Sequence, residues 1–286
     1  MEFPQRAFQT LLRLGLEEDI PKSDITTEAI VPHDFLVRAV IIAKQQGILS
    51  GLPGLPLSFG NKCRVDFQKK DSDILQPGET IAVIRGPAAQ ILTLERISLN
   101  FIQRSSGIAT ITQRFVERAG KRIKILGTRK TPPGYRELDR YAIVMGGGNA
   151  HRAHLSDQIL IKENHFYIAK LLGKSFEAVL QDIASKNAVF QTEVETLEQA
   201  CIAAKYTDHI LLDNMAPPQL EICIKEIRKI NPEAQIEASG GITLNNIPEL
   251  ALLDLDRISL GYLTHSVTTF DFSLDIQESI RSISGG

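Results

Sequence analysis

Cysteine is scarce in this 286-residue sequence, which has only three, far apart and without a C-x-x-C pair. Their number and spacing argue against a disulfide framework and against a structural zinc site. No apolar run approaches the roughly 18 residues that a membrane-spanning helix needs. The amphipathic, acidic N-terminal segment also lacks the continuous apolar stretch of a signal peptide. We therefore expect a reduced, soluble protein of the cytoplasm.

An excess of charge is also missing, since 32 basic residues face 34 acidic ones. The net charge of −2 provides no overall field that would attract nucleic acid or an anionic membrane, so we predict neither as a partner. The charges are nevertheless uneven, because residues 121–170 contain ten basic and four acidic side chains. Such a local excess is typical either of a solvated face or of a binding site for anions.

The length favours about two domains. Residues 1–110 mix helix-like and strand-like segments with turns such as Gln76-Pro77-Gly78, which predicts a small N-terminal α+β domain. A long amphipathic helix begins near Ala88, and we expect Gly107 to kink or end it. We assign residues 111–270 to a catalytic domain and residues 271–286 to a C-terminal helix that packs back on the N-terminal domain.

The segment 111–270 alternates short apolar runs with helix-length segments. The apolar runs are 123–126, 159–161, 190–192, 210–212, 235–238 and 258–260, and the helix-length segments are 168–186, 197–205, 218–230 and 244–252. Repeated alternation of this kind predicts a parallel sheet with right-handed crossovers. With six or seven such units, the fold class is α/β and the sheet is expected to form a β/α barrel.

Polar or glycine residues follow each predicted barrel strand. In chain order they are Arg129-Lys130, Lys162, Glu193, Asp213, Ser239-Gly240-Gly241 and Gly261. Functional residues of β/α barrels lie at these strand ends. The last two loops are typical of a phosphate site, because glycine lets backbone N–H groups approach a ligand closely. Taken alone, each of the two loops is explained more simply as an ordinary tight turn.

A second cluster of candidate residues follows three consecutive glycines, Gly146-Gly147-Gly148, which precede His151 and Arg152. Three glycines cost conformational entropy, and the sequence gives little structural reason for all of them. Arg129, Lys130 and Arg152 are suited to carboxylates and phosphates, and His151 adds a hydrogen-bond donor. These residues predict a polyanionic ligand that carries at least one phosphate.

The acidic strand ends admit more than one role. Glu193 and Asp213 are suited to Mg²⁺ or to ribose hydroxyls, and charge balance for the neighbouring cations is the simpler alternative. Lys162 also admits a second interpretation, because a lysine at the end of a barrel strand can form a Schiff base with a carbonyl substrate.

A series of motifs extends over essentially the whole chain. In order they are Asp24-Ile25-Thr26-Thr27, Asn100-Phe101-x-x-Arg104-x-Ser106-Gly107-Ile108-Ala109-Thr110, Thr128-Arg129-Lys130-Thr131-x-Pro133-Gly134, Gly146-Gly147-Gly148-x-x-His151-Arg152, Leu160-Ile161-Lys162-x-Asn164-His165, Glu193-Val194-Glu195, Leu211-Leu212-Asp213-Asn214-Met215, Ser239-Gly240-Gly241 and Gly261-x-Leu263-Thr264-His265-Ser266. This set closely resembles the quinolinate phosphoribosyltransferase family, also called nicotinate-nucleotide pyrophosphorylase (carboxylating). Gly127 and Ala150 depart from residues common in that family, which bears on fine specificity rather than on the reaction.

The resemblance implies an N-terminal open sandwich domain and an incomplete barrel of seven strands. It also implies a homodimer in which the partner's N-terminal domain completes each barrel mouth, with Arg104 reaching the site across that interface. The implied catalytic residues are Lys130, Lys162, Glu193 and Asp213. The implied substrate-binding residues are Arg104, Arg129, Lys130, His151, Arg152, Lys162, Glu193, Asp213, Ser239, Gly240, Gly241, Gly261 and His265. Mg²⁺ is expected at Glu193 and Asp213, largely through the substrate.

The implied reaction transfers phosphoribosyl from phosphoribosyl pyrophosphate to quinolinate, giving nicotinate mononucleotide, CO₂ and pyrophosphate, a step of NAD biosynthesis. A related phosphoribosyltransferase that acts on another pyridine acid is one alternative. A Schiff-base lyase that uses Lys162 is an alternative from another enzyme class, and a non-catalytic sensor of a phosphorylated ligand is a third.

Overall fold

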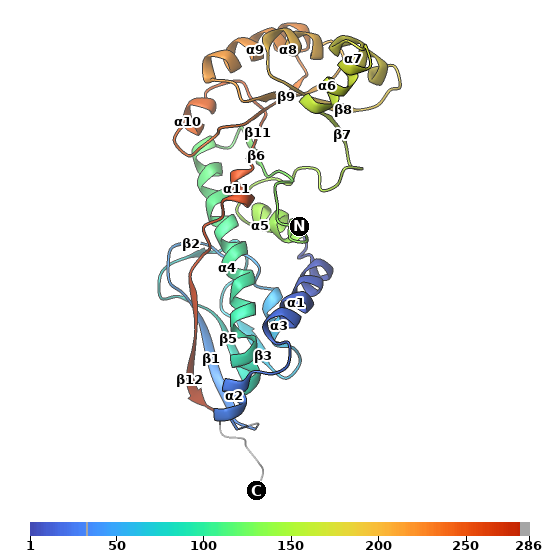
Figure 1. The fold of residues 1–286 in the computed structure, drawn as a ribbon. Coiled ribbons are helices and arrows are strands. Elements are labelled where there is room, and N and C mark those ends of the chain that lie inside the picture. The colour runs from blue at the N-terminus through green and yellow to red at the C-terminus, as the bar shows by residue number, and fades with distance from the viewer. Residues whose placement is uncertain (33, 281–286) are drawn as a thin grey trace. The chain divides into compact units, whose positions relative to one another are not determined.

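The computed structural model describes residues 1–32 and 34–280, and its chain divides into two units (Figure 1). The N-terminal unit comprises Met1–Gln113, Lys130–Gly147 and the chain from Tyr262 onward, and the barrel unit comprises Arg114–Arg129 and Gly148–Gly261. The division at Gln113 lies close to the predicted boundary at residue 110. Residues 130–147 and 262–270, which we assigned to the barrel domain, group instead with the N-terminal unit.

The N-terminal unit is built on antiparallel strands. Its four-stranded sheet has the order β12 (Phe272–Ser279), β1 (Leu36–Ala43), β5 (Thr80–Pro87) and β3 (Arg64–Phe67), and β2 (Gly47–Ile48) pairs with β4 (Ile74–Leu75). Its helices are α1 (Gln5–Asp19), α2 (Ile25–Ile30), α3 (Gly54–Phe59), α5 (Arg136–Met145), α11 (Tyr262–His265) and most of α4 (Ala88–Ala119). The strand-like segments of the sequence at 37–43, 63–67 and 80–85 correspond to β1, β3 and β5.

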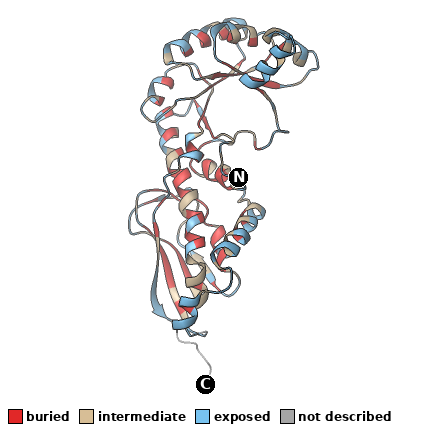
Figure 2. Cartoon of the chain, in the orientation of Figure 1, coloured by how far each residue is buried: buried red, intermediate tan, exposed pale blue. Residues whose placement is uncertain are grey.

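The core of this unit lies between the sheet and α4. Ile91 and Leu99 of α4 share one buried cluster with Ile41 of β1 and Ile84 of β5, and all four are almost fully buried. Figure 2 shows the buried residues concentrated along these elements. Each such side chain contributes about 1.5–3 kcal/mol through the apolar surface that it removes from water. The same cluster anchors α4, which carries Arg104.

Two expectations for this unit are wrong. The segment 271–286 is not a helix where it is described, because β12 pairs antiparallel with β1 over most of its length. The alternation of Phe272, Leu274 and Ile276 is the period of a strand, and Phe272 is 3% exposed. Residues 281–286 lie outside the described range. Gly107 does not end α4 either: its missing side chain leaves room for the Thr268 carbonyl, which a Cβ would overlap.

The barrel unit contains a six-stranded parallel sheet. Its order is β6 (Lys124–Leu126), β11 (Arg257–Ser259), β10 (Gln235–Ser239), β9 (His209–Asp213), β8 (Phe190–Val194) and β7 (Ile159–Ile161). A single bridge from Asn149 to Leu126 takes a seventh position beside β6. The α/β fold class and the incomplete barrel are therefore confirmed, with one residue of the described chain in the place of a full seventh strand.

The helices of this unit follow the strands in alternation. They are α6 (Glu163–Leu171), α7 (Phe176–Ala184), α8 (Leu197–Ala203), α9 (Pro217–Ile230) and α10 (Ile247–Leu250). The single helix predicted over 168–186 is two helices, α6 and α7, separated near Gly173, whose φ is +77°. No helix within residues 1–32 and 34–280 has the length and apolar character needed to cross a bilayer.

The two faces of the parallel sheet differ in character because side chains alternate along each strand. Ile210, Ile236 and Ile258 occupy one face of β9, β10 and β11 and are fully buried. The other face carries polar side chains, among them Glu237 and Ser239 of β10. The candidate site lies at the carboxyl ends of these strands.

Candidate active site

The predicted strand-end residues lie along one edge of the parallel sheet. Glu193, Asp213 and Ser239 belong to the ends of β8, β9 and β10, whereas Lys162 directly follows β7. Asp213 and Ser239 are paired in register on neighbouring strands. The common direction of the strands places these functional groups on the same side of the barrel unit.

Lys162 and Glu193 are joined directly. The Lys162 ammonium donates a hydrogen bond to Glu193 Oε2, across the neighbouring strands β7 and β8. The Glu193 side chain is 11% exposed and that of Lys162 45%. The pair therefore joins a largely buried carboxylate to a cation that remains accessible, and each side chain orients the other.

Arg129 and Arg152 form the cationic part of the site. Burial lowers the pKa of the Arg152 guanidinium, and the positive charge of Arg129 lowers it further. Arg152 donates one hydrogen bond, 2.9 Å long, to the Gln158 carbonyl oxygen. The Nε of Arg129 is buried and forms no hydrogen bond within the described residues. Two guanidiniums that repel one another and retain free donors are suited to an anion with carboxylate or phosphate oxygens.

The turn after β10 is shaped by glycine. Gly240 has a φ of +86°, and a Cβ there would overlap the Asn214 side chain and lie 2.9 Å from the Asn214 backbone nitrogen. Gly241, with a φ of +62°, faces open space. Asn214 itself has a φ of +54° and donates from Nδ2 to Asp213 Oδ2 at 2.7 Å. Gly240 therefore leaves room for the Asn214 side chain beside Asp213, and Gly241 leaves its own part of the turn open, as a close approach of phosphate requires.

Two of the three consecutive glycines have structural reasons that the sequence did not reveal. A Cβ on Gly146 would overlap the Ala109 carbonyl oxygen of α4, and Gly147 has a φ of +85°. These positions are explained within the N-terminal unit by packing and by backbone conformation. The expectation that there is little structural reason for these glycines is therefore wrong for Gly146 and Gly147.

Arg104, Lys130 and His265 belong to the N-terminal unit, where Thr264 connects them. Arg104 Nη2 donates to the Thr264 carbonyl at 3.1 Å, and the Thr264 hydroxyl donates to the Lys130 carbonyl at 2.8 Å. His265 follows in α11, with Nδ1 2.6 Å from the Ser266 hydroxyl. Arg104 also donates hydrogen bonds to Asp139, a residue that we did not select from the sequence. Its position as an acidic residue in the otherwise apolar stripe of 136–145 could have identified it.

His151 lies beside Glu237, a second residue that sequence reasoning missed. The distance from His151 Nε2 to Glu237 Oε1 is 3.7 Å, and the side chain of Glu237 is 1% exposed. A charged residue between Ile236 and Ala238, in the middle of a buried strand, was the signal that could have identified it.

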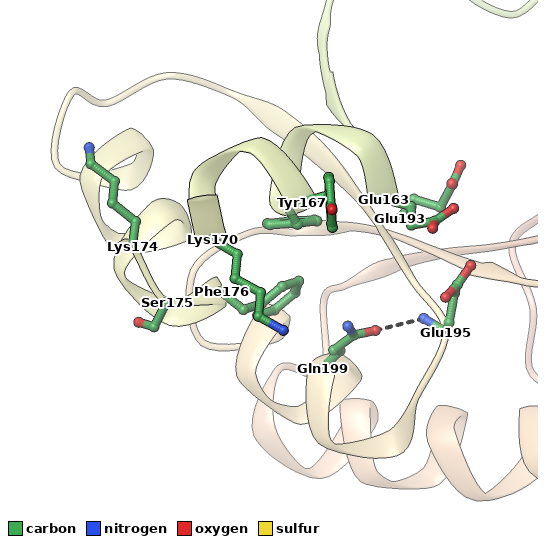
Figure 3. A pocket seen from close by; sticks show the side chains of 10 residues that line it. Glu163, Tyr167, Lys170, Lys174, Ser175, Phe176, Glu193, Glu195 and Gln199 are labelled. Carbon is green, nitrogen blue, oxygen red and sulfur yellow. Dashed lines mark hydrogen bonds between the residues drawn. The ribbon is translucent and has the colours of Figure 1, made fainter. Parts of the chain in front are cut away.

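A pocket of about 420 Å³ opens between α6, α7 and the end of β8 (Figure 3). Glu163, Glu193 and Glu195 gather on one side of it, and Lys170 approaches from α6. Burial raises the pKa of the Glu195 carboxyl, and the charges of Glu163, Asp213 and Glu193 raise it further. The pocket thus extends the strand-end site, through Glu193, into an acidic region.

This acidic region does not form a metal cage of the protein's own. No group of three or more His, Cys, Asp or Glu side chains in the described part of the chain is arranged to hold a metal ion. Glu193 is engaged by Lys162, and Asp213 by Asn214. Two partly engaged carboxylates fit a divalent ion that brings most of its ligands with it, such as the phosphate oxygens of a substrate.

Fold and site together define a β/α-barrel protein with cations, carboxylates and a glycine turn at its strand ends. The model of the quinolinate phosphoribosyl transferase C-terminal domain matches residues 108–275, and that of the N-terminal domain of the same family matches residues 24–106. The chain belongs to the quinolinate phosphoribosyl transferase family.

Relatives and solved structures agree with this assignment. A probable nicotinate-nucleotide pyrophosphorylase [carboxylating] of Bacillus subtilis is 39% identical over 272 residues, which cover 93% of this chain and 92% of that protein. The corresponding protein of Archaeoglobus fulgidus is 37% identical and covers 90% of this chain and 99% of its own length. The structure of NadC from Streptococcus pyogenes superposes with a TM-score of 0.86 at 35% identity, over 97% of this chain and 100% of that one.

Proposed function

We propose that the protein transfers the phosphoribosyl group of phosphoribosyl pyrophosphate to quinolinate, with loss of CO₂, and forms nicotinate mononucleotide and pyrophosphate. Its family and the names of its relatives support this reaction. In the structure, the observation that carries the proposal is the proximity of Arg129 and Arg152. Their mutual repulsion is relieved by a bound anion, and quinolinate carries two neighbouring carboxylates, one of them on the ring carbon beside the reacting nitrogen.

The candidate side chains of the barrel unit divide the binding of the two substrates between them. Arg129, His151 and Arg152 bind the pyridine dicarboxylate. Lys162 and Glu193 face the pyrophosphate and the ribose. Two substrates that repel one another are thereby held in contact by fixed charges, which is the main requirement for catalysis without a protein nucleophile.

The remaining candidates surround the other parts of the two substrates. Asp213 contacts ribose hydroxyls, and the turn Ser239-Gly240-Gly241 with Gly261 binds the 5′-phosphate. Arg104, Lys130 and His265 complete the set of substrate-binding residues. For these three the support is the family motif alone.

The bonds change in two steps. The lone pair of the pyridine nitrogen forms a bond to C1 of the ribose, while the C1–O bond breaks and its electron pair leaves with pyrophosphate. The bond from the neighbouring ring carbon to its carboxylate then breaks, because the positive ring nitrogen stabilises the electron pair left behind. CO₂ departs, and a proton from solvent takes its place on the ring carbon.

We further propose that Mg²⁺ enters this site bound to pyrophosphate, as part of the substrate. When bound, it withdraws charge from the leaving oxygens. Glu193 and Asp213 would contact it, and Lys162 would lie beside the same leaving group. No group of three or more potential ligands among the described residues is arranged to hold a metal ion, which supports an ion held largely by phosphate rather than by the chain.

A homodimer with shared sites is proposed on the family resemblance, with the N-terminal unit of one chain completing the barrel mouth of the other. A cytoplasmic location stays a prediction, as does the absence of a nucleic-acid or membrane partner. The Schiff-base lyase has less support than the transferase. Lys162 is ion-paired with Glu193, whereas a Schiff-base lysine requires an unpaired, neutral amine.

The decisive experiment supplies purified protein with Mg²⁺, phosphoribosyl pyrophosphate and quinolinate labelled with ¹³C in the carboxylate beside the nitrogen. We expect labelled CO₂ and nicotinate mononucleotide in equal amounts. A parallel reaction with nicotinate in place of quinolinate should give no product. Product from nicotinate alone would assign the protein to another pyridine acid, and product from neither acid in folded protein would contradict the proposal.

A further inference from the structure

The polar face of the barrel sheet holds a carboxylate that the proposed reaction does not use. Glu237 lies on β10, two residues before Ser239 and on the same face of the strand, and its side chain is 1% exposed. Placing a carboxylate this far from water is costly unless neighbouring groups donate hydrogen bonds or carry positive charge. The groups around the Glu237 carboxylate therefore indicate its role.

One oxygen of this carboxylate is fixed and the other faces a candidate substrate-binding residue. Gln191 of β8 donates from Nε2 to Glu237 Oε2 at 2.9 Å, so the contact spans the intervening strand β9. Glu237 Oε1 lies 3.7 Å from His151 Nε2. Burial raises the pKa of the Glu237 carboxyl, but His151, Ser259 and Gln191 outweigh burial and hold the pKa below its ordinary value. The Glu237 carboxylate is therefore charged. Gln191 fixes one of its oxygens, and the other oxygen faces His151.

The other charged groups near Glu237 do not take the place of His151. His209 projects from β9, and burial together with Arg257 lowers the pKa of its imidazole, although Asp208 and Glu237 oppose the shift. A neutral His209 cannot balance the carboxylate. Arg257 of β11 donates a hydrogen bond to Gln235 at 3.2 Å. His151 is the cation-forming group that faces Glu237 Oε1 at ion-pair distance.

We propose that Glu237 is a positioning residue: it holds the His151 ring through Nε2 and favours a proton on that nitrogen. The inference rests on the proposed function in one respect, namely that His151 binds a carboxylate of the pyridine substrate. A ring anchored at Nε2 presents its opposite edge and a partial or full positive charge beside Arg152. The side chain of Glu237 thus acts on the substrate through His151 without touching it.

The first test compares two substitutions, each of which preserves the size of the side chain that it replaces. In Glu237→Gln the side-chain volume and an acceptor for Gln191 remain, but the charge is lost. We expect the KM for quinolinate to rise about tenfold, the loss typical of one charge-assisted contact, with less than twofold changes in kcat and in the KM for phosphoribosyl pyrophosphate. Thr192→Val is the matched control, because this buried hydroxyl on the same sheet has no hydrogen-bond partner in the described residues. It should leave all three constants unchanged.

A double-variant cycle separates positioning from simple structural support. If Glu237 acts through His151, then Glu237→Gln should change the KM for quinolinate less than twofold in a His151→Gln background. A tenfold rise that persists in that background would overturn the inference. So would an equal loss of kcat and of both KM values in Glu237→Gln, which is the signature of general damage.

A spectroscopic readout makes the inference independent of turnover. In protein labelled with ¹⁵N-histidine, the signals absent from His151→Gln identify His151, and we expect its Nε2 to carry a proton in the wild type. A neutral ring protonated only at Nδ1 would overturn the inference without any variant at Glu237. If the wild type turned over neither pyridine acid, the proposed function would fail while this spectrum still decided the role of Glu237.

Discussion

Arg104 and Asp139 form a bidentate pair inside the N-terminal unit, with Arg104 Nε and Nη2 donating to the two carboxylate oxygens at 2.9 and 2.7 Å. The guanidinium also lies 5.3 Å from the centre of the Tyr135 ring and donates to the Thr264 carbonyl. The Asp139 side chain is 1% exposed and that of Arg104 21%. The arginine is therefore fixed in orientation by its own chain, and Asp139 depends on it for compensation of a buried charge.

Replacement of Asp139 should lower stability. In Asp139→Asn the guanidinium keeps at most one of its two carboxylate contacts, so we expect unfolding free energy to fall by about 1–3 kcal/mol, measured by urea denaturation at pH 7. Glu137→Gln on the same helix is the control, because its contact with Arg140 is 3.4 Å long and less buried. The control should change stability by less than about 0.5 kcal/mol. Equal effects of the two substitutions would contradict the importance of the bidentate pair.

The buried carboxyl of Asp71 predicts how the stability of the fold changes with pH. Burial raises the pKa of this carboxyl, although the Tyr141 hydroxyl and the backbone N–H groups of Gly51 and Leu52 oppose the shift. A carboxyl with a raised pKa stabilises the fold below its unfolded pKa of 3.8, and this contribution is lost as pH rises through the folded value. Urea unfolding across pH 4 to 7 should therefore show a falling component in the wild type that is missing in Asp71→Asn.

A second substitution tests the cause of that shift. Tyr141→Phe removes the hydroxyl that donates to Asp71 at 2.6 Å. Because that hydrogen bond lowers the pKa of Asp71, its removal should move the falling component of stability to higher pH. A shift to lower pH, or none, would show that the hydroxyl does not stabilise the ionised carboxyl.

The turn after β10 predicts unequal effects of two neighbouring glycine substitutions. Gly240→Ala combines a left-handed backbone with an overlap at Asn214, whereas Gly241→Ala meets only the backbone penalty, since nothing lies within 4 Å of its Cβ. We expect stability losses of about 2–4 and about 1 kcal/mol respectively. Gly240→Ala should also raise the KM for phosphoribosyl pyrophosphate, because the Asn214 turn beside Asp213 must move. Equal losses of stability would contradict the overlap as the cause.

Much of the barrel could be predicted because its strands are short apolar runs with polar residues at their ends. The expected strands at 159–161 and 210–212 coincide with β7 and the centre of β9. The alternation of strands and helices fixes the direction of the sheet, and therefore the edge on which Lys162, Glu193 and Asp213 lie. This part of the prediction depended on local pattern alone.

The missed features depend on contacts between distant segments. Helix α5 follows Pro132-Pro133-Gly134, and its grouping with the N-terminal unit rather than with the barrel has no local signal. The close approach of Ala109 to Gly146 likewise joins residues far apart in sequence. The helix expected at the C-terminus is a strand because β1 offers it an unpaired edge. Glu237 was overlooked because the run 235–238 was interpreted only as a strand.

Arg152 should be functional rather than structural. Its removal breaks one hydrogen bond to Gln158 and relieves repulsion with Arg129, so Arg152→Ala should change the melting temperature little. Quinolinate binding should weaken by about 2–3 kcal/mol through the lost charge-assisted contact. Arg152→Lys, which keeps the charge but not the planar fork, should recover part of that loss. Calorimetric titration measures the quinolinate affinity of both variants, and thermal unfolding measures their melting temperatures. A large fall in melting temperature with unchanged affinity would mark Arg152 as structural.

The shared site of the proposed dimer predicts complementation between two inactive chains. Arg104→Ala disables the arginine that the family motif places across the interface, and Lys162→Ala disables the barrel unit beside Glu193. Mixed dimers contain one site in which the barrel unit and the partner's N-terminal unit are both intact, so mixing should restore up to half of the wild-type activity per mixed dimer. Differently tagged chains allow that species to be purified before the assay. Because Arg104→Ala also leaves Asp139 without its partner, Arg104→Lys is needed as a second variant that preserves a buried cation. Inactivity of both mixed dimers, in chains that fold and associate, would mean that each site is complete within one chain.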